Sequence, residues 1–275
     1  MPNTTTAAAR PLALITGASA GIGAEYARQM AAAGHDLVLT ARRRERLDAL
    51  AATLREAHGC AVQVIAADLT EPDAPAAIVE AITAEGRSVD VLVNNAGYAI
   101  AGVYHQTEWQ DQADFLQVMV TAVAELTHRL LPAMRENGRG GVINIASLAG
   151  AVPGSSGHTL YAAVKSWMIS FSESLAMENA KAGVCVQALC PGFTYSEFHD
   201  VVGTRDIVSK MPDYMWMTAE EVVRISLDRF GDLNAPVMLI PGRWNRFVAM
   251  LARKLPYRMA FGLVKKRSGE FRRQE

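Results

Sequence analysis

Several features are scarce in this 275-residue sequence, and each scarcity excludes a class of protein. Only three cysteines occur (Cys60, Cys185 and Cys190), and no Cys-x-x-Cys pair or Cys/His spacing typical of a metal site is present. We interpret them as reduced core residues, because such a set forms no disulfide framework. No apolar run approaches the roughly 18 residues that span a bilayer, and the N-terminus lacks the apolar core of a signal peptide. The sequence therefore favours a cytoplasmic protein without a metal site.

A large excess of charge of one sign is also missing from the chain as a whole. With 27 Lys/Arg and 28 Asp/Glu, the formal net charge is −1, so the composition gives no indication of nucleic-acid binding. The charge is unevenly distributed, however. Residues 243–275 contain ten Lys/Arg and two Asp/Glu, a net charge of +8, which leaves −9 for residues 1–242. We therefore expect an acidic body that carries a basic C-terminal extension.

Apolar residues, by contrast, are abundant: they make up 50% of the chain and predict a globular protein with a sizeable core. Short apolar runs, typical of strands, alternate with longer segments of helical period. The expected strands are residues 12–16, 36–40, 61–66, 89–93, 141–145, 184–189 and 237–240. The expected helices are residues 22–33, 43–57, 72–84, 109–135, 160–181 and 222–230, with Pro72 near the start of its helix.

The strand runs are continuously apolar, which is typical of a parallel sheet covered by helices on both faces. Joined by right-handed crossovers, they predict a doubly wound, Rossmann-type α/β fold: a three-layer sandwich around a seven-stranded parallel sheet. No linker or repeat divides the chain. Residues 1–242 are therefore expected to form a single domain, followed by the extension 243–275.

A glycine-rich turn, TGASAGIG, follows the first expected strand and precedes a helix. Glycines at such a turn allow the backbone to approach a pyrophosphate, and the helix N-terminus favours the anion. A strand-to-helix turn without a ligand would also explain the GxxxGxG spacing, but its place in the first βα unit favours dinucleotide binding. The candidate residues of this turn are Gly17, Ser19, Gly21, Ile22 and Gly23.

The residues that end the second strand indicate which dinucleotide is bound. An acidic residue at this position would bind the ribose hydroxyls of NAD, but this chain has Thr-Ala followed by Arg42, Arg43 and Arg44. Arginines at a helix N-terminus oppose the helix dipole, and a bound 2′-phosphate would reverse the sign of that interaction. A solvated basic face is the alternative. We favour NADP, with Arg42 as the main contact and Arg43 as support.

Polar and glycine residues also follow the third and fourth strands, where ligands bind open α/β sheets. Asp68 and Leu69 follow the third strand, and Asn94, Ala96 and Gly97 follow the fourth. Each group alone could cap a loop. Together they are expected to line one crevice and to contact the cofactor.

Ser147 follows the fifth strand, and Tyr161 and Lys165 lie four residues apart in the next helix. This spacing places phenol and ammonium on one helix face. The ammonium favours phenolate and should lower the pKa of Tyr161, which is near 10 for a free phenol. Tyr161 is then predicted to act as the acid/base of a carbonyl/alcohol pair, with Ser147 hydrogen-bonded to the same oxygen. Such a pair is common by chance on a helix, so the order of all these motifs carries the prediction.

Together, TGASAGIG, Asp68, NNAG, Ser147, YAAVK and Pro191-Gly192 resemble the short-chain dehydrogenase/reductase family over residues 12–242. The stretches ARRRERL, AADLT and FSESLA…ALCPG are similar to a bacterial, DltE-like branch of oxidoreductases. The resemblance implies hydride transfer between NADP and a carbonyl carbon. It assigns acid/base chemistry to Tyr161, ribose binding and tuning of Tyr161 to Lys165, and substrate orientation to Ser147. It further implies Asp68 beside the adenine, Asn94 and Gly97 along the dinucleotide, and, beside the nicotinamide, Pro191, Gly192, Thr194 and Ser196.

One position departs from the family pattern. The resemblance implies an Asn in the long fourth helix, 13 residues before Pro132, which holds a water that relays protons through the lysine. This chain has Met119 there, within Met-Val-Thr-Ala, and a thioether accepts hydrogen bonds only weakly. Thr121 is two residues away and faces elsewhere on a helix. The alternative function is therefore an NADP-binding sensor or scaffold with impaired turnover.

Substrate contacts are expected from the loops after strands four, five and six. The third of these, residues 193–217, is long, apolar and rich in methionine, which suits irregular hydrophobic ligands. We therefore expect a bulky apolar ketone, aldehyde or alcohol, such as a steroid, aromatic or fatty compound; residues that only pack this segment are the alternative. The candidates are Tyr98, Ile100, Val103, Tyr104, Leu148, Ala149, Val152, Pro153, Tyr195, Phe198, Val201, Val202, Ile207, Met211, Met215 and Trp216, with Arg205 and Lys210 as possible charged contacts.

The C-terminal extension has its own pattern. Apolar residues recur at spacings of three to four in residues 244–255 and mark one face of a helix, with basic residues mostly off that face and beyond it. Such a helix can lie in a membrane interface and attract anionic lipids. Alternatively, it packs on a subunit or covers the substrate cleft. The family resemblance also implies a homo-oligomer.

Overall fold

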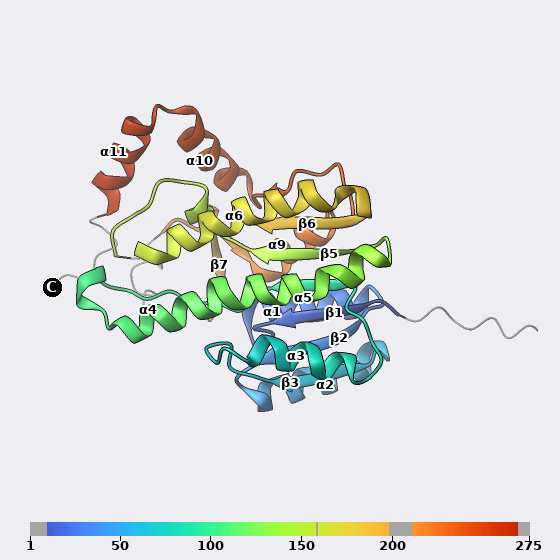
Figure 1. The fold of residues 1–275 in the computed structure, drawn as a ribbon. Helices are drawn as coiled ribbons and strands as arrows, with labels where there is room; N and C mark the ends of the chain where they lie inside the picture. The colour runs from blue at the N-terminus through green and yellow to red at the C-terminus, as the bar shows by residue number, and fades with distance from the viewer. Residues whose placement is uncertain (1–9, 158, 198–210, 269–275) are drawn as a thin grey trace, which may run out of the picture.

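The computed structural model describes residues 10–157, 159–197 and 211–268. Seven parallel strands form the central sheet, as predicted, and their order is β3-β2-β1-β4-β5-β6-β9 (Figure 1). The chain order reverses between β1 and β4, and ligands of open α/β sheets bind outside the carboxyl ends at such a point. The strands are β1 (Leu12–Thr16), β2 (Asp36–Ala41), β3 (Val62–Ala66), β4 (Val91–Asn94), β5 (Gly140–Ile145), β6 (Val184–Leu189) and β9 (Met238–Leu239).

Helices cover both faces of the sheet and bury a separate apolar core on each side (Figure 1). One core is packed by α1 (Gly21–Ala32), α2 (Arg44–His58) and α9 (Ala219–Leu227). The other is packed by α3 (Ala74–Thr83), the α4–α5 helix and α6 (Thr159–Asn179). The three cysteines are buried and free, as predicted. The apolar strands are thus explained by burial on both faces.

The helix predicted for residues 109–135 is continuous in space but not uniform. Its two α-helical parts, α4 (Trp109–Leu116) and α5 (Ala122–Glu136), are joined by a π-helical turn at Gln117–Thr121. The N–H of Ala122 donates to the carbonyl of Gln117, five residues back. Apolar periodicity alone does not report such a turn, which is common at functional sites.

Other boundaries also differ from the predictions. The third helix begins at Ala74, so Pro75 rather than Pro72 lies in its first turn. The helix expected from residue 222 begins at Ala219, because Thr218 and Glu221 form a capping box. Two short parallel strands, β7 (Phe193–Tyr195) and β8 (Trp216–Thr218), were not predicted. Single 3₁₀ turns lie at Tyr104–Gln106, Leu148–Gly150, Ala180–Ala182 and Asp213–Met215.

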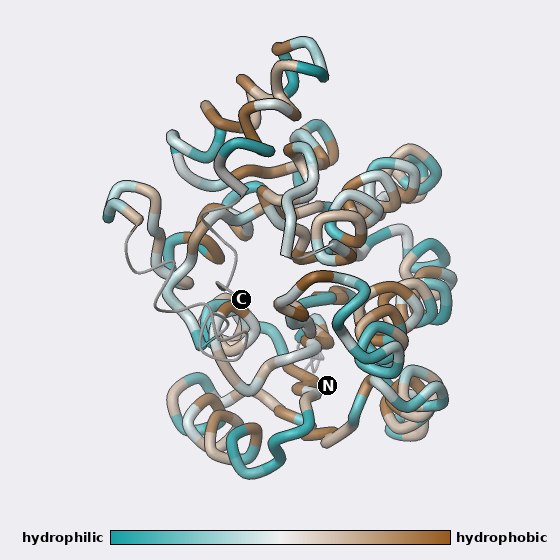
Figure 2. Tube along the Cα trace, turned by 90° about the vertical axis from the view of Figure 1, so that its left-hand side faces the viewer, coloured by the Kyte–Doolittle hydropathy of each residue, from teal (hydrophilic) through white to brown (hydrophobic). Residues whose placement is uncertain are grey.

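The C-terminal lobe, residues 243–268, consists of α10 (Arg243–Lys254) and α11 (Tyr257–Ser268), and it projects from the sandwich (Figures 1 and 2). The first helix corresponds to the predicted amphipathic segment, whereas the second was not predicted. Asn245 anchors the lobe: its side chain is buried and donates to the carbonyl of Pro241 over 2.9 Å. Among the described residues, no helix is long and apolar enough to cross a membrane.

Candidate active site

A cavity of about 1000 Å³ lies at the carboxyl ends of the strands. Its wall includes the loops after β1 to β5, the π-helical turn at Gln117–Thr121, the start of α6, the segment from Pro191 to Glu197, Met215 and the C-terminal lobe. Most predicted site residues come together there. Those that line the cavity are Gly17, Ser19, Gly21, Ile22, Arg42, Arg43, Asp68, Leu69, Ala96, Gly97, Ser147, Tyr161, Lys165, Pro191, Gly192, Thr194 and Ser196.

Ser147, Tyr161 and Lys165 form one cluster on this wall. The hydroxyl of Ser147 accepts a hydrogen bond from the N–H of Ala149 over 3.1 Å and is also hydrogen-bonded to Tyr161. The Lys165 Nζ lies 5.6 Å from the centre of the Tyr161 ring and donates to the carbonyl of Ile145 over 2.6 Å. The predicted helical spacing thus brings the three groups together.

Close packing holds this cluster in place. A Cβ on Gly150 would lie 2.5 Å from the backbone carbonyl carbon of Lys165. Only a glycine therefore allows the turn after Ser147 to approach α6 so closely. This contact joins the end of β5 to the helix that carries the other two groups.

The protonation of the cluster differs from the expectation. Burial raises the pKa of Tyr161 to about 12, although the hydrogen bond with Ser147 acts in the opposite direction. Burial also lowers the pKa of Lys165 to about 8. The expected depression of the tyrosine pKa by the ammonium is not found, because desolvation of the phenolate is the larger effect. At neutral pH the phenol is protonated and can donate its proton to an oxygen in the cavity.

The glycine turn is fitted tightly against the loop after β4. Gly17 has a φ of 65°, and a Cβ on Gly23 would lie 2.4 Å from Nδ2 of Asn95. That same amide donates to the carbonyls of Thr16 and Gly17 over 2.9 and 3.2 Å. Gly23 therefore lies outside the cavity wall and acts through packing. Asn95 itself lines the cavity and fixes the turn.

The entrance to α1 fits a dinucleotide phosphate. Its N-cap, Ala20, provides no side-chain acceptor, so the first N–H groups of the helix are left for another partner. Gly17 and Gly21 both have positive φ and face the cavity without a side chain. These features are those that a pyrophosphate requires, and the residues present therefore fit a dinucleotide cofactor.

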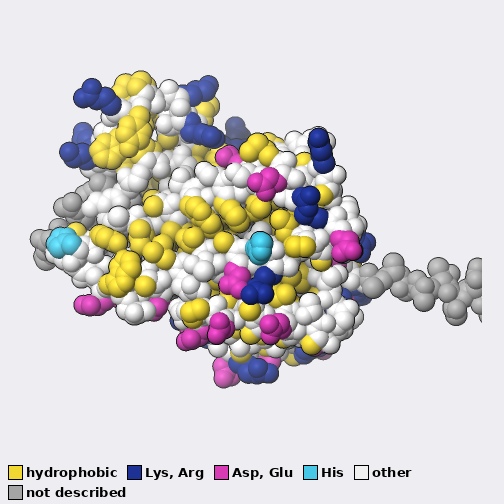
Figure 3. Space-filling view, in the orientation of Figure 1, with side chains coloured by type: hydrophobic (Ala, Val, Ile, Leu, Met, Phe, Trp, Pro, Cys, Tyr) yellow, Lys and Arg dark blue, Asp and Glu magenta, His cyan; other side chains and the backbone are white. Residues whose placement is uncertain are grey.

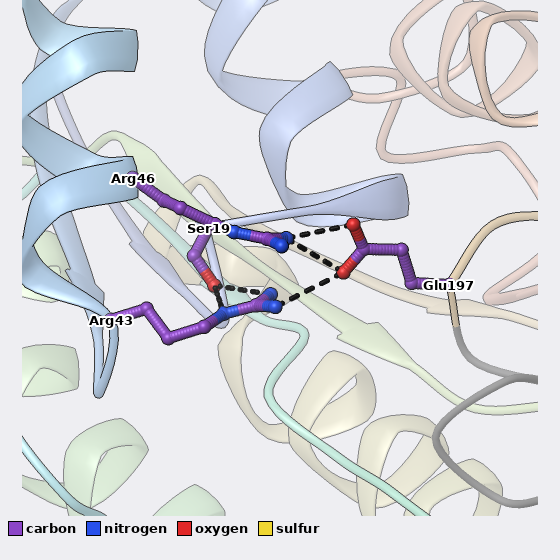
Figure 4. A network of polar contacts seen from close by, with 4 residues as sticks. All are labelled: Ser19, Arg43, Arg46 and Glu197. Carbon is purple, nitrogen blue, oxygen red and sulfur yellow. Dashed lines mark hydrogen bonds and ion pairs between the residues drawn. The ribbon is translucent and has the colours of Figure 1, made fainter.

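Arginines mark the neighbouring part of the wall. The guanidinium of Arg43 donates to the Ser19 hydroxyl over 3.0 and 3.3 Å and to Glu197 over 3.1 Å, and Arg46 donates to both oxygens of Glu197 over 2.7 and 2.8 Å (Figure 4). Both arginines hold the pKa of Glu197 below its usual value. Arg42 lines the cavity, is exposed, and forms no ion pair within the described residues. The guanidinium of Arg42 is therefore available there for an anion, whereas Arg43 is shared with Ser19 and Glu197.

Asn94 does not line the cavity, in contrast to the expectation. It is 2% exposed, and its amide donates to Asn144 on β5 over 2.9 Å and to Thr127 on α5 over 3.2 Å. Asn144 in turn donates to Ser172 on α6 over 2.9 Å. Asn94 thus belongs to a buried polar network beneath the site, because the side chain of the last strand residue points into the sandwich.

Met119 occupies the π-helical turn and lines the cavity, although it is fully buried. A Cβ on Gly97 would lie 2.6 Å from its Sδ, so the thioether packs directly on the loop after β4. Val118 lies beside it on the wall. This part of the site is apolar, as the sequence predicted from the absence of an Asn.

The candidate substrate residues are divided. Those on the cavity wall are Tyr98, Leu148, Ala149, Val152 and Met215. Those elsewhere are Ile100, Val103, Tyr104, Pro153, Tyr195, Met211 and Trp216. Tyr195 is instead 49% exposed and stacks on Trp216 at 4.7 Å between ring centres. The remaining candidates, Phe198, Val201, Val202, Arg205, Ile207 and Lys210, lie outside the described residues.

The C-terminal lobe completes the apolar part of the wall. Its lining residues are mostly large and apolar, and they include Trp244, Phe247, Val248, Leu251, Leu255 and Leu263. A Cβ on Gly192 would lie 2.5 Å from the side chain of Asn245, so α10 begins directly on the segment after β6. The lobe thus covers part of the cleft, which is one of the arrangements expected for the extension, and the spacing of its apolar residues was the signal.

The chain is similar to several known proteins. The sequence model described as "short chain dehydrogenase" matches residues 11–206. Nodulation protein G of Rhizobium sp. strain N33 is 38% identical over 213 residues, which cover 76% of this chain and 85% of that protein.

Two solved structures are also similar. A short-chain dehydrogenase from Sphingobium yanoikuyae in complex with NADPH has a TM-score of 0.77 and 35% identity, covering 90% of this chain and 96% of that one. A bulky-bulky ketone specific alcohol dehydrogenase from Comamonas testosteroni has a TM-score of 0.73 and 32% identity, covering 90% and 95%. Both similarities extend beyond the sequence-matched region into the C-terminal part of the chain.

Proposed function

The chain belongs to the short-chain dehydrogenase/reductase family of oxidoreductases, and we propose that it interconverts a carbonyl and an alcohol on a bulky apolar substrate with NADP. The observation that carries this proposal is the cluster of Ser147, Tyr161 and Lys165 on the wall of a cavity that is also lined by the glycine turn. Hydride donor, proton donor and substrate need to meet within one space, and this cavity brings the corresponding residues together.

The chemistry follows from the three side chains. In the reducing direction, the protonated phenol of Tyr161 donates its proton to the carbonyl oxygen as negative charge develops there. Ser147 hydrogen-bonds to the same oxygen and orients it. The Lys165 ammonium, four residues along the same helix, stabilises the phenolate that remains. The cofactor, when bound, would supply a hydride to the carbonyl carbon as NADPH in this direction and would accept it as NADP⁺ in the reverse direction.

The choice of NADP over NAD rests on the arginines after β2. Ser19, Arg42 and Arg43 line the cavity, and no acidic residue ends β2. The similar Sphingobium enzyme binds NADPH. The further cofactor contacts are proposed for Gly17, Gly21, Ile22, Asp68, Leu69, Ala96, Gly97, Pro191, Gly192, Thr194 and Ser196.

Titration of the protein with NADPH and NADH tests this choice by tryptophan fluorescence. We expect tighter binding of NADPH, and we expect Arg42→Ala to weaken NADPH more than tenfold while it leaves NADH unchanged, since a charged hydrogen bond to a phosphate contributes roughly 1.5–3 kcal/mol. Equal affinities of the unmutated protein for both cofactors would refute the choice of NADP.

The substrate class rests on the lining of the cavity. Apolar side chains of the C-terminal lobe face the catalytic cluster, and the described wall offers few charges near it. The similar Comamonas enzyme is specific for bulky-bulky ketones. We expect single-turnover hydride transfer from NADPH to ketones with two large substituents and little transfer to small charged ketones. Faster transfer to the charged ketones would refute the substrate class.

Met119 favours a second candidate function, that of an NADP-binding sensor or scaffold with slow turnover. Its thioether is buried where a polar side chain would hold water, and it packs on Gly97. Met119→Asn introduces that polar group, and we expect a higher rate of single-turnover hydride transfer. No hydride transfer by the unmutated protein to any ketone of the panel, together with tight NADPH binding, would favour the sensor.

The surface of the C-terminal lobe favours contact with an anionic membrane. Its outer side chains include Met250, Tyr257, Met259 and Phe261, which are 43–70% exposed, and residues 243–268 contain no Asp or Glu (Figure 3). Exposed basic residues surround them: Arg243, Arg246, Arg253, Lys254, Arg258, Lys265 and Lys266. Apolar side chains with basic flanks suit a lipid interface, and an apolar substrate would be available there.

Co-sedimentation with vesicles tests this contact. The full chain should bind phosphatidylglycerol vesicles and not phosphatidylcholine vesicles, and Arg253→Glu with Lys254→Glu should abolish binding. Absence of binding at low salt would refute the contact. If the two substitutions instead change the oligomeric state, the lobe packs on another copy, and a homo-oligomer through it would replace the membrane.

A further inference from the structure

Glu197 places a carboxylate on the cationic part of the cofactor groove. It lies just after β7, whereas its partners Arg43 and Arg46 come from the start of α2, about 150 residues earlier (Figure 4). Its oxygens accept three hydrogen bonds from these two guanidinium groups. Glu197 lines the cavity together with Ser19 and Arg43.

The donors that Glu197 occupies are those that an anionic ligand would use. Arg43 divides its guanidinium between the hydroxyl of Ser19 and the carboxylate of Glu197. Ser19 belongs to the glycine turn. The Ser19 hydroxyl and the Arg43 guanidinium therefore lie on the part of the cavity wall where we place the 2′-phosphate. A carboxylate and a phosphate are both oxygen anions and require the same N–H donors.

The segment that carries Glu197 also lies close to the glycine turn. A Cβ on Gly21 would lie 3.2 Å from the Cβ of Ser196, the residue before Glu197. The ion pairs therefore fasten the segment after β7 to the start of α2, while Ser196 lies close to Gly21 of the glycine turn. A cofactor phosphate at Arg43 has to share this guanidinium with the carboxylate or displace it.

From this geometry we propose that Glu197 competes with the 2′-phosphate of NADP for Arg43 and thereby reduces the preference of the site for NADP over NAD. The proposal rests on the proposed use of NADP. NAD has a hydroxyl where NADP has the phosphate, so the competition applies to NADP alone. Arg46 weakens this competition, because the Glu197 carboxylate keeps Arg46 as a partner when the phosphate displaces it from Arg43.

Glu197→Gln removes the competing charge and keeps the shape of the side chain. We expect it to tighten the binding of NADPH and of adenosine 2′,5′-bisphosphate about fivefold, the factor that corresponds to the ~1 kcal/mol of an exposed ion pair. The affinity for NADH should not change. Fluorescence titration for the dinucleotides and calorimetry for the bisphosphate measure these affinities without turnover.

Asp48→Asn is the matched control. Asp48 lies on α2, as Arg46 does, and pairs with Arg44 at 3.7 Å. Asp48→Asn therefore changes the net charge of the region by the same amount as Glu197→Gln, but it leaves the partners of Arg43 unchanged. We expect less than a twofold effect on NADPH. A fivefold effect in the control would attribute the change to the overall field and overturn the proposal.

A double-mutant cycle with Arg46→Gln identifies the competition itself. In the otherwise unmutated chain this change leaves Glu197 with Arg43 as its remaining partner, so NADPH binding should weaken severalfold. In the Glu197→Gln chain the same change should have little effect. Equal effects of Arg46→Gln in both chains would overturn the proposal.

The outcomes separate this proposal from the proposed cofactor. If the unmutated chain prefers NADPH and Glu197→Gln leaves or lowers that affinity, the competition is overturned and the choice of NADP stands. If the unmutated chain binds NADPH and NADH equally and Glu197→Gln tightens neither, both are overturned. A tighter complex of Glu197→Gln with NADPH and the bisphosphate, with NADH unchanged, supports both.

Discussion

The two sides of the cavity are built in opposite ways. On the sheet side, Lys165 is 5% exposed, and a Cβ added to Gly23 would overlap its neighbours at 2.4 Å. On the lobe side, Phe247, Leu251 and Leu263 line the cavity but remain 47%, 40% and 54% exposed. The groups proposed to carry the chemistry are thus held by dense packing, whereas those proposed to contact the substrate lie on two helices with little packing around them.

This difference indicates where substitutions are compatible with the proposed carbonyl/alcohol chemistry. Packed interiors respond to added or removed atoms, because the neighbours have no space to relax. Partly exposed side chains have that space. Substitutions on the sheet side should therefore alter catalysis or folding, and those on the lobe side should alter selectivity alone. Four substitutions, each with a matched control, test this division.

The largest effect is expected for Tyr161→Phe on the sheet side. Loss of the proposed proton donor should lower kcat at least about 100-fold, with unchanged affinity for NADPH by fluorescence titration. Tyr98→Phe is the control, since Tyr98 lines the same cavity, burial also raises its pKa to about 12, and its ring packs edge-on against Phe115. A Tyr161→Phe enzyme that keeps most of its rate would place the chemistry elsewhere.

The second effect concerns packing. Gly23→Ala should lower the free energy of unfolding by up to about 3 kcal/mol, because the new methyl meets Asn95 and the Gly17 carbonyl. Gly262→Ala in α11 has no atom within 4 Å of its added Cβ and should raise stability by less than about 1 kcal/mol. Urea unfolding measures both. Equal destabilisation by the two changes would contradict the contrast between the two sides.

Much of the fold was predictable from the sequence, because continuous apolar runs such as that at β1 are explained only by burial on both faces. The residues of the candidate site were less predictable from the sequence. Asn94 and Asn95 are neighbours, but only the second lines the cavity, and the sequence does not say where the strand ends. Glu197 gave no signal, since its partners lie on α2, far away in the sequence. The sequence showed the apolar periodicity of α10, but it did not show that this apolar face lines the cavity.

The third prediction uses the buried ammonium of Lys165, whose pKa burial lowers from 10.5 to about 8. Between these two pH values the unfolded chain binds a proton that the folded chain has released, so stability increases with pH across this window. Relative to Lys165→Met, the unmutated chain should gain about 3 kcal/mol between pH 7.5 and 10.5. Lys254→Met on the exposed lobe should show no such pH-dependent difference. Urea unfolding at both pH values provides the measurement.

The smallest effect is expected on the lobe side. Val248→Ala should lower kcat/KM for a bulky ketone about tenfold, because it removes apolar contact in the pocket, and it should leave small ketones and the affinity for NADPH unchanged. Met250→Ala is the control: Met250 lies on the same helix but does not line the cavity and is 45% exposed. Steady-state kinetics with both ketones would show the division to be wrong if Val248→Ala slowed the two equally.

The π-helical turn at Gln117–Thr121 is equivalent to one residue inserted into an α-helix. Deletion of one residue from this turn would let α4 and α5 run as one regular helix. The deletion would also rotate α4 by about 100° relative to α5. Phe115, 1% exposed on α4, would then leave the core. The extra residue therefore sets the phase between the two halves of the helix, and an alignment with relatives that have a regular helix here requires a one-residue gap beside Met119.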